Sequence, residues 1–592
     1  MKKLRRNVYA AALGTAMLLG QVAPVFAEDE PATEQPAQPT GGVTVTAATQ
    51  GMNYSIYQLF TGDFKTDGVE IPQELVDGKA QTGSIPNKNK IGNVEFGSAA
   101  GKDGAILITT INEYMKGTEN WEPLDAKASA YDVAKKISDT PALQTTKFSN
   151  ALANQVEAKS SPVATALPDQ ENNVVFSDLT SGYYLIASTE PEGAQDTTKT
   201  HTSAIMLPVD GNVAIHSKTS KPTLEKHIQE DENGEWNTAG TVGVIKKDEK
   251  GNFEITPVKF RLTGTVAKDL ADYNGKYAYK FVDTLPAGIN LDGQFPADWK
   301  TTIQITGKNS EGADVGPVPL GGKNKPDPVV GVNDKGLSTI TWSWSNLKRI
   351  LTDCGIDFSY EHAADIVITV EYEVHLTDDQ IKSLYAAQAE ITNPFTNTAY
   401  VEFSNNPRSE GSTDKTPDDE VNYYSFNLEL HKISQDEKAL VGAEFELKDA
   451  DGNVVGNLIT TDQNGQFVFT GLDSDKEYTL TEVKAPDGYK KIEPITFKLV
   501  PQYNGDANKK LVSVDVVVIS DTSKALTVTG EKTENENTFH ITTVNVEGTV
   551  INIEGPSMPL TGQAGIWTGV AVGGVVIAMS AFGILRKKKE SE

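Results

Sequence analysis

The amino-acid sequence predicts a mainly β protein built from tandem β-sandwich domains. Short runs in which apolar and polar residues alternate recur along most of the chain, and a period of two is the pattern of a half-buried strand. Asp-Gly, Asn-Gly and other turn sequences separate these runs, at the spacing typical of sandwiches. The length of 592 residues predicts roughly three or four domains. Because the chain has one cysteine, no intramolecular disulfide can join them.

The chain begins with a predicted export signal. Residues 1–27 combine a basic start, an apolar middle and the small-residue ending Val-Phe-Ala, which is the pattern of a cleaved signal peptide. Residues 28–41 are rich in Pro, Glu and Gln and predict a disordered leader. The net charge of -28 argues against nucleic acid as a partner, because phosphates require Lys and Arg.

Residues 42–219 are predicted to form the first domain, a β-sandwich with a helical insertion. Alternating segments begin at Val43 and return at 182–186 and 203–207. Between them, over about 106–157, apolar residues recur at helical spacing.

Residues 220–421 are predicted to form a middle domain that is also rich in strands. The expected strands are 259–266, 277–282, 338–344 and 366–375. We expect a helix at 377–388, and the Gly- and Pro-rich segment 311–333 predicts a long exposed loop. The polar segment 405–419 predicts a linker to the next domain.

Residues 422–555 are predicted to form a third domain with short strands divided by tight turns. The middle and third domains open alike, because each places a lysine, Lys226 or Lys432, inside a strand of alternating apolar residues. A lysine that faces a sandwich core is costly, since desolvating an ammonium group costs several kcal/mol. Such a lysine is tolerated if it becomes neutral or is consumed in a reaction.

The third domain contains a sequence box that suggests such a reaction. Residues 478–489, Tyr-Thr-Leu-Thr-Glu-Val-Lys-Ala-Pro-Asp-Gly-Tyr, resemble the Tyr-x-Leu-x-Glu-x-x-x-Pro-x-Gly-Tyr box of the collagen-adhesin B-type (Cna B) domain. The resemblance implies an Ig-like sandwich in which Lys432 bonds covalently to an asparagine on the last strand. Asn552 matches the usual place of this asparagine, and Asn545 is the alternative. Glu482 of the box would supply the acid.

These three residue types suit the formation of an amide bond. Burial pushes a lysine towards its neutral, nucleophilic form and a carboxyl towards its protonated form. The neutral Glu482 can polarise the asparagine carbonyl, and Lys432 can then attack its carbon and release ammonia. This would be a single-turnover self-modification rather than enzyme turnover, and we expect no cofactor and no metal.

A second cluster is expected in the middle domain. Residues 281–288, Phe-Val-Asp-Thr-Leu-Pro-Ala-Gly, resemble a strand of the A-type collagen-adhesin (Cna A) and middle pilin domains. The resemblance implies Lys226 as nucleophile, Asp283 as acid and Asn397 as acceptor, with Asn393 as an alternative acceptor. No such bond is expected in the first domain, because its first strand lacks a lysine.

The C-terminal segment 556–592 has three parts in a fixed order. A short motif comes first, and its residues are Met558, Pro559, Leu560, Thr561 and Gly562. An uncharged apolar run over 566–585 follows, long enough to cross a bilayer as a helix, and a basic cluster at 586–589 ends it. The order resembles the LPxTG-type cell-wall sorting signal of Gram-positive surface proteins, with Met558 in place of Leu. The resemblance implies that a sortase cleaves after Thr561.

The junction between the first two domains carries a further motif. Residues 213–218, Val-Ala-Ile-His-Ser-Lys, resemble the pilin motif of sortase-assembled backbone pilins, whose core is Val-x-Val-Tyr-Pro-Lys. This implies that Lys218 of one subunit accepts Thr561 of another, with Lys221 as the alternative. Taken together, the chain resembles the major backbone (shaft) pilins of Gram-positive pili over essentially its whole length.

The resemblance also implies partners and a location. The partners would be other copies of the chain, pilus-type and housekeeping sortases, ancillary pilins and peptidoglycan, on a fimbria at the cell wall that supports adhesion and colonisation. No host ligand is indicated. A monomeric wall-anchored adhesin would share every feature except an active Lys218, and an ancillary pilin is a second alternative. A secreted enzyme has little support, because the chain has no His-Glu-x-x-His or Gly-x-Ser-x-Gly motif.

Overall fold

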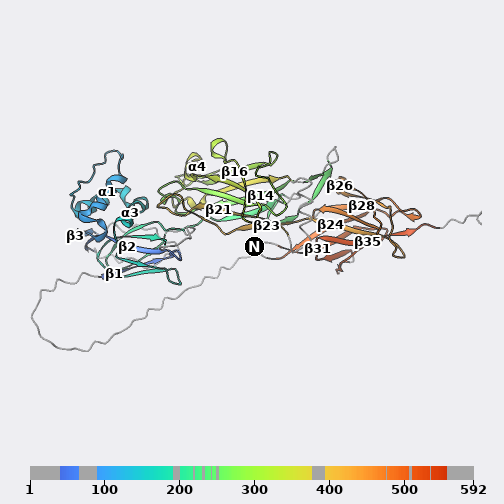
Figure 1. Ribbon diagram of the computed structural model, residues 1–592, viewed down its shortest axis with the longest axis horizontal. Helices are drawn as coiled ribbons and strands as arrows, with labels where there is room; N and C mark the ends of the chain where they lie inside the picture. The colour runs from blue at the N-terminus through green and yellow to red at the C-terminus, as the bar shows by residue number, and fades with distance from the viewer. Residues whose placement is uncertain are drawn as a thin grey trace, which may run out of the picture.

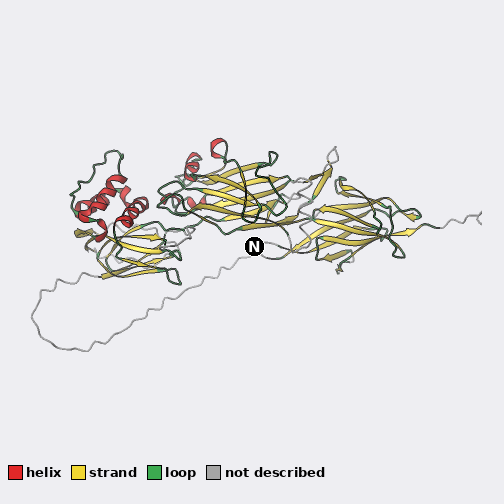
Figure 2. Cartoon of the chain, in the orientation of Figure 1, coloured by secondary structure: helices red, strands yellow, loops and turns green. Residues whose placement is uncertain are grey.

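The computed structural model shows a mainly β chain whose strand-rich parts follow one another along its long axis (Figure 1). It describes residues 40–65, 90–190, 200–217, 220–229, 234–241, 243–247, 253–255, 257–375, 394–474, 476–505, 510–533, 535 and 537–556. Most helical turns lie in the N-terminal part (Figure 2). The predicted fold class, β-sandwiches with a helical insertion in the first, is confirmed.

The first domain packs two sheets against each other. The β1 sheet has the order β5–β1–β8, and the β2 sheet has the order β3–β2–β6–β7, with β4 beside β2. The strands are β1 (Thr40–Thr46), β2 (Asn53–Lys65), β3 (Lys90–Phe96), β4 (Ala164–Ala166), β5 (Val174–Thr180), β6 (Gly182–Thr189), β7 (Ile205–Val209) and β8 (Asn212–His216). Apolar side chains of both sheets, such as Val43, Phe176 and Tyr184, form the core between them.

The helical insertion lies between β3 and β4. Its elements are η2 (Ser98–Ala100), η3 (Lys102–Gly104), α1 (Ala105–Tyr114), α2 (Ala130–Asp139), η4 (Pro141–Gln144) and α3 (Thr146–Lys159). A capping box begins α2, because Ser129 Oγ accepts from the Asp132 amide while the Asp132 carboxylate accepts from the Ser129 amide. Apolar residues of these helices pack with Leu59 and Leu185 of the β2 sheet in a second core.

The middle domain is a larger sandwich. The β14 sheet has the order β10–β9–β14–β20–β16–β17, and the β15 sheet has the order β11–β23–β21–β15–β19–β18, with β22 beside β21. Their strands are β9 (Leu224–Gln229), β10 (Trp236–Asn237), β11 (Ala239–Thr241), β14 (Val258–Thr265), β15 (Tyr279–Thr284), β16 (Thr301–Lys308), β17 (Asp314–Pro319), β18 (Val329–Val332), β19 (Ser338–Trp344), β20 (Val367–Val374), β21 (Phe395–Ser404), β22 (Thr413–Lys415) and β23 (Asp419–Tyr424). Burial alternates residue by residue along β20 and β21, so each strand turns one face to the core.

Shorter elements complete the middle domain. They are η5 (Leu270–Asp272), η6 (Gly322–Asn324), α4 (Leu347–Asp353) and η7 (Ala363–Asp365). The strands β12 (Val244–Lys247) and β13 (Phe253–Ile255) pair antiparallel and lie beside β26 (Val454–Thr460) of the third domain. The core between the two sheets is aromatic, with Phe281 and Trp342 from the β15 sheet and Phe260 and Tyr372 from the β14 sheet.

The expectation of a long loop at 311–333 is wrong. The segment contains β17, which pairs with β16, and β18, which pairs with β19. Among the described strands, both stand last in their sheets. Proline is tolerated there because its missing N–H is not needed by a further strand. The helix expected at 377–388 lies outside the described residues.

The expectation of a linker at 405–419 is also wrong, because this segment joins the middle domain to the first. It contains β22 and the start of β23. Asn405 is buried, and its carbonyl accepts from the His201 amide of the first domain at 2.8 Å. Thr200 Oγ1 and Lys221 Nζ both donate to Asp414, at 3.0 and 2.5 Å.

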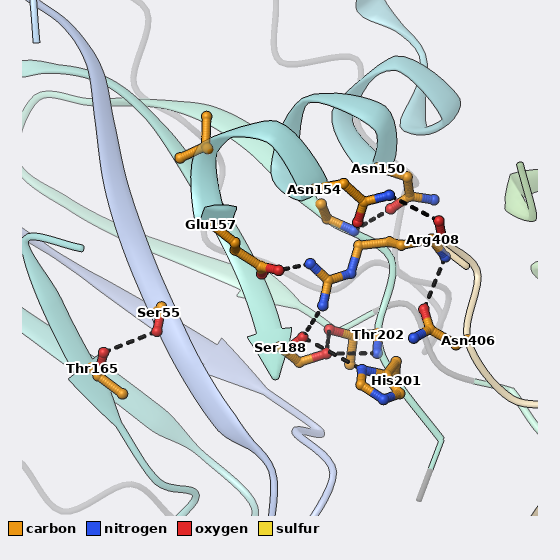
Figure 3. A network of polar contacts seen from close by, with 12 residues as sticks. Ser55, Asn150, Asn154, Glu157, Thr165, Ser188, His201, Thr202, Asn406 and Arg408 are labelled. Carbon is orange, nitrogen blue, oxygen red and sulfur yellow. Dashed lines mark hydrogen bonds and ion pairs between the residues drawn. The ribbon is translucent and has the colours of Figure 1, made fainter. Parts of the chain in front are cut away.

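Arg408 stands at the centre of this joint (Figure 3). Its guanidinium donates to Glu157 Oε1 of α3 at 2.5 Å and to the Ser188 carbonyl of β6. Its own carbonyl accepts from Asn154 Nδ2 at 2.9 Å. Because the arginine is buried, with 7% of its surface exposed, these polar contacts satisfy a charge that would otherwise be costly.

The third domain is a sandwich of the β24 sheet and the β28 sheet. The β24 sheet has the order β27–β24–β35–β29, with β32 beside β35, and the β28 sheet has the order β26–β25–β28–β30–β31–β34–β33. The strands are β24 (Phe426–Ser434), β25 (Glu444–Asp449), β26 (Val454–Thr460), β27 (Gln466–Leu472), β28 (Glu477–Lys484), β29 (Tyr489–Lys490), β30 (Ile495–Tyr503), β31 (Leu511–Ser520), β32 (Leu526–Val528), β33 (Glu531–Lys532), β34 (Thr538–Ile541) and β35 (Asn545–Glu554). The expected boundary after residue 421 falls within β23.

Neither predicted end segment can be compared with the structure. The expected signal peptide and the segment from 557 onwards lie outside the described residues. Within the ranges that the structure describes, no helix is both long enough and apolar enough to span a bilayer.

Two buried lysine, carboxyl and asparagine clusters

The third domain brings Lys432, Glu482 and Asn552 together in its core. Lys432 lies on β24 and Asn552 on β35, which are parallel neighbours in one sheet with Ser434 opposite Asn552. Even-numbered residues of both strands face inward, so period two turns both side chains to the same face. Glu482 points at them from β28 of the opposite sheet.

The three side chains contact one another directly, and each is fully buried. Lys432 Nζ donates to Asn552 Oδ1 at 2.5 Å, and Asn552 Nδ2 donates to Glu482 Oε1 at 3.0 Å. The distance between Lys432 Nζ and Glu482 Oε1 is 3.6 Å. The second carboxyl oxygen, Oε2, accepts from the Ile492 amide at 2.9 Å, which holds the carboxyl in place.

The surroundings favour a neutral amine. Burial lowers the pKa of Lys432 to about 8, although the neighbouring Glu482 opposes this shift. The Phe445 ring centroid lies 5.7 Å from Lys432 Nζ. A deprotonated amine has the free lone pair that nucleophilic attack requires, and here that amine touches the carboxamide that it could attack.

The middle domain places Lys226, Asp283 and Asn397 in an equivalent buried cluster. Lys226 lies on β9 of the β14 sheet, whereas Asp283 on β15 and Asn397 on β21 belong to the β15 sheet. The cluster therefore spans the two sheets of the sandwich. Lys226 Nζ donates to Asp283 Oδ2, and the Lys226 amide donates to Asp419 Oδ2 at 2.7 Å. The three side chains of the cluster are fully buried.

A tyrosine completes the middle cluster. Asn397 Nδ2 donates to the Tyr372 hydroxyl oxygen at 2.8 Å, and Tyr372 is 1% exposed. Burial lowers the pKa of Lys226 and raises that of Asp283, while the charge of each partner opposes the shift of the other. Both directions favour a neutral amine beside a neutral acid.

The alternative residues behave differently where the structure describes them. Asn545 accepts from Asn427 Nδ2 at 2.8 Å at the start of β35, which is the far end of the strand from Asn552. Lys221 pairs with Asp414 in the joint between the first two domains. Asn393 and Lys218 lie outside the described residues, and so does the motif from Met558 to Gly562.

Sequence reasoning missed Tyr372. The residue lies within the strand expected at 366–375 and faces inward with its neighbours of like parity. An inward tyrosine in an alternating strand is an ordinary core residue, so the pattern carries no signal for its contact with Asn397. The contact depends on the packing of one sheet on the other.

Parts of this chain are similar to known proteins. Residues 426–515 match the family model of SpaA, described as a prealbumin-like fold domain. Serine-aspartate repeat-containing protein D of Staphylococcus aureus (strain Newman) is 24% identical over 510 residues, which cover 75% of this chain. The chain spans 37% of the length of that relative.

The solved structures that the chain was found to resemble include two pilins. The T6 backbone pilin of serotype M6 Streptococcus pyogenes is 14% identical, with 88% of this chain and 100% of that chain covered at a TM-score of 0.44. The full-length major pilin SpaD of Corynebacterium diphtheriae is 16% identical, with 87% and 98% covered at a TM-score of 0.40.

Proposed function

We propose that this chain is the structural subunit of a covalently polymerised pilus, anchored to the cell wall of a Gram-positive bacterium and supporting adhesion and colonisation. The observation that carries the proposal is the pair of buried clusters in the middle and third domains. Each cluster holds an amine, a carboxyl and a carboxamide away from water. The match of residues 426–515 to the prealbumin-like SpaA domain supports the same function.

In the third domain, the proposed reaction joins Lys432 to Asn552. The neutral Lys432 amine attacks Asn552 Cγ, which is one bond from the oxygen that it contacts at 2.5 Å. The Cγ–Nδ2 bond breaks, and the nitrogen leaves as ammonia after it gains the proton that the lysine loses. Glu482 hydrogen-bonds the carboxamide and transfers that proton. The product is an amide between the first and last strands of the domain.

In the middle domain, the corresponding bond joins Lys226 to Asn397, with Asp283 as the acid. Each bond forms once and consumes the residues that make it. The chain therefore modifies itself in a single turnover and does not act as an enzyme. By analogy with a disulfide, closing the loop between Lys432 and Asn552 would reduce the conformational entropy of the unfolded chain. The folded domain would be stabilised by on the order of 4–5 kcal/mol.

Polymerisation is proposed to join Thr561 of one subunit to Lys218 of another. A pilus-type sortase cysteine attacks the Thr561 carbonyl, and the chain from Gly562 onwards leaves. The Lys218 amine of a second copy then displaces the cysteine and forms an amide. A housekeeping sortase would join the base of the polymer to peptidoglycan, and ancillary pilins would share the fibre. These steps rest on the sequence motifs.

The polymer is tested on cell-wall extracts boiled in SDS. The chain, expressed in a cell that carries its sortases, should give a ladder of high-mass bands on an immunoblot, and Thr561→Ala should remove the ladder. A single wall-linked band from the unaltered chain would show a monomeric wall-anchored adhesin instead. A band confined to the ends of a polymer built from another subunit would show an ancillary pilin.

A further inference from the structure

The two clusters differ in the groups around the asparagine nitrogen, because the middle cluster adds a tyrosine hydroxyl. In the third domain, Glu482 Oε1 accepts from Asn552 Nδ2 at 3.0 Å and lies 3.6 Å from the lysine nitrogen, so one carboxyl oxygen serves both partners. In the middle domain, Lys226 engages the carboxyl of Asp283. The nitrogen of Asn397 donates to the hydroxyl of Tyr372 at 2.8 Å, and the Asp283 carboxyl also hydrogen-bonds both Tyr372 and Asn397.

Tyr372 is held firmly in this position. It lies on β20 opposite Phe260 of β14, and its ring centroid is 5.3 Å from those of both Phe260 and Trp342. The Lys226 nitrogen lies 5.8 Å from the centroid of the same ring. The hydroxyl crosses from the β14 sheet to Asn397 in the β15 sheet, so the residue touches the acceptor amide and faces the nucleophile.

We propose that Tyr372 is a catalytic residue for the Lys226–Asn397 bond, and that its hydroxyl delivers the proton to the departing Asn397 nitrogen. The inference rests on the proposed function, because it assumes that this bond forms. It assigns to a phenol in the middle domain the proton delivery that is proposed for the Glu482 carboxyl in the third domain.

The proton balance of the step is complete without any other reactant. As the Lys226 nitrogen bonds to Asn397 Cγ, the neutral Asp283 gives its proton to the Asn397 oxygen, and the resulting carboxylate then takes one proton from the Lys226 nitrogen. Loss of amide resonance then gives the Asn397 nitrogen a basic lone pair, so its hydrogen bond with Tyr372 reverses direction. The Tyr372 proton moves to this nitrogen, the Cγ–Nδ2 bond breaks, and ammonia leaves. The proton on Asp283 then moves to the Tyr372 oxygen, and the hydroxyl proton of the adduct returns to Asp283 as the carbonyl re-forms.

The environment keeps the phenol ready for this role. Burial and the neighbouring Asp283 raise the pKa of Tyr372 well above its ordinary value, so the hydroxyl carries its proton throughout the physiological range. If the Asn397 nitrogen of the tetrahedral adduct is not protonated, it would have to leave as an amide anion, which is a very poor leaving group. The adduct then releases the Lys226 amine and returns to the starting residues. A proton donor at the leaving nitrogen therefore decides whether the adduct goes forward.

Tyr372→Phe tests the role, because it removes the hydroxyl and keeps the ring. Full-length chains made by cell-free translation would be sampled over time, and peptide mapping by mass spectrometry would follow both cross-linked peptides in each sample. We expect the Lys226–Asn397 bond to form on the order of a hundredfold more slowly, while the Lys432–Asn552 bond in the same molecules keeps its rate. Tyr279→Phe is the matched control, since it loses a buried hydroxyl bonded to the Thr265 carbonyl in the same core.

The outcomes separate this role from a structural one and from the proposed function itself. A wild-type rate in Tyr372→Phe would overturn the catalytic role alone. A chain with native Tyr372 that never forms the middle bond would overturn the proposed cross-link, and the inference with it. Adding Tyr372→Phe to the Lys226→Arg variant, which cannot close the bond, should leave its melting temperature nearly unchanged. A large fall there would show that the hydroxyl acts through folding.

Discussion

Lys432 Nζ lies 2.5 Å from Asn552 Oδ1, although the two residues are 120 positions apart in the chain. The two residues stand on neighbouring parallel strands of one sheet. In the middle domain the lysine and the asparagine come from opposite sheets instead. The same pair of residue types is therefore brought together by two different strand arrangements, and each arrangement makes its own predictions.

Replacing Asn552 by Ala should prevent the bond in the third domain. The intact mass of the ectodomain should then lack the loss of one ammonia, and the free energy of unfolding of this domain should fall by about 4–5 kcal/mol. Asn545→Ala is the matched control, because Asn545 lies at the other end of β35 and should keep the bond. A normal ammonia loss in Asn552→Ala would assign the acceptor elsewhere.

Bond formation in the third domain should accelerate as the pH rises. The pKa of Lys432 in the folded chain is about 8, and the reacting species is the neutral amine. Below that pH, each unit decrease leaves about tenfold less neutral amine, so the rate should fall with decreasing pH and level off above about 8. Time courses of the cross-linked peptide from freshly translated chains at several pH values would measure it. A rate that rises on acidification would contradict the assignment of Lys432 as nucleophile.

Lys218→Ala should abolish the polymer, whereas Lys221→Ala should preserve it. The Lys221 ammonium donates to the largely buried Asp414 carboxylate, and a lysine held as a charged partner is a poor nucleophile. The SDS-resistant ladder on an immunoblot gives the readout for both variants. Loss of the ladder in Lys221→Ala alone would reverse the assignment.

Arg408→Ala should loosen the joint between the first and middle domains. Removing the arginine leaves Glu157 of α3 without its cation, and loss of one partner of a buried pair costs about 3–5 kcal/mol. Small-angle X-ray scattering should show a broader distribution of lengths, and residues 405–416 should become sensitive to protease.

An exposed ion pair provides the control for that experiment. Lys135 and Asp139 pair on α2 with more than half of each side chain exposed, and solvent screens such an exposed pair so that it adds little to stability. Lys135→Ala should therefore leave the scattering profile unchanged. Equal profiles for Arg408→Ala and the unaltered chain would show that the joint does not depend on the arginine.

Much of the site could be predicted because it follows local rules. An inward lysine in an alternating strand is conspicuous, which is why Lys226 and Lys432 could be selected, and Glu482 lies in a sequence box. Tyr372 could not be selected, because an inward aromatic residue is unremarkable until the opposite sheet is placed. Arg408 was missed for a related reason. The polar segment that contains Arg408 has the composition of a linker. The arginine is buried only because α3 of the first domain packs against this segment.

The parallel pairing of β24 and β35 determines where tension would travel through a cross-linked third domain. The proposed joint at Thr561 follows β35, so a pulling force on it reaches Asn552 after only a few residues of chain. Across the bond, it passes to Lys432 on β24 and leaves towards the middle domain. The 119 residues between these two would carry none of the pull. When such a fibre is stretched by flow acting on the cell, only a few residues of each such domain would carry the load. The remaining residues of the domain would keep their fold.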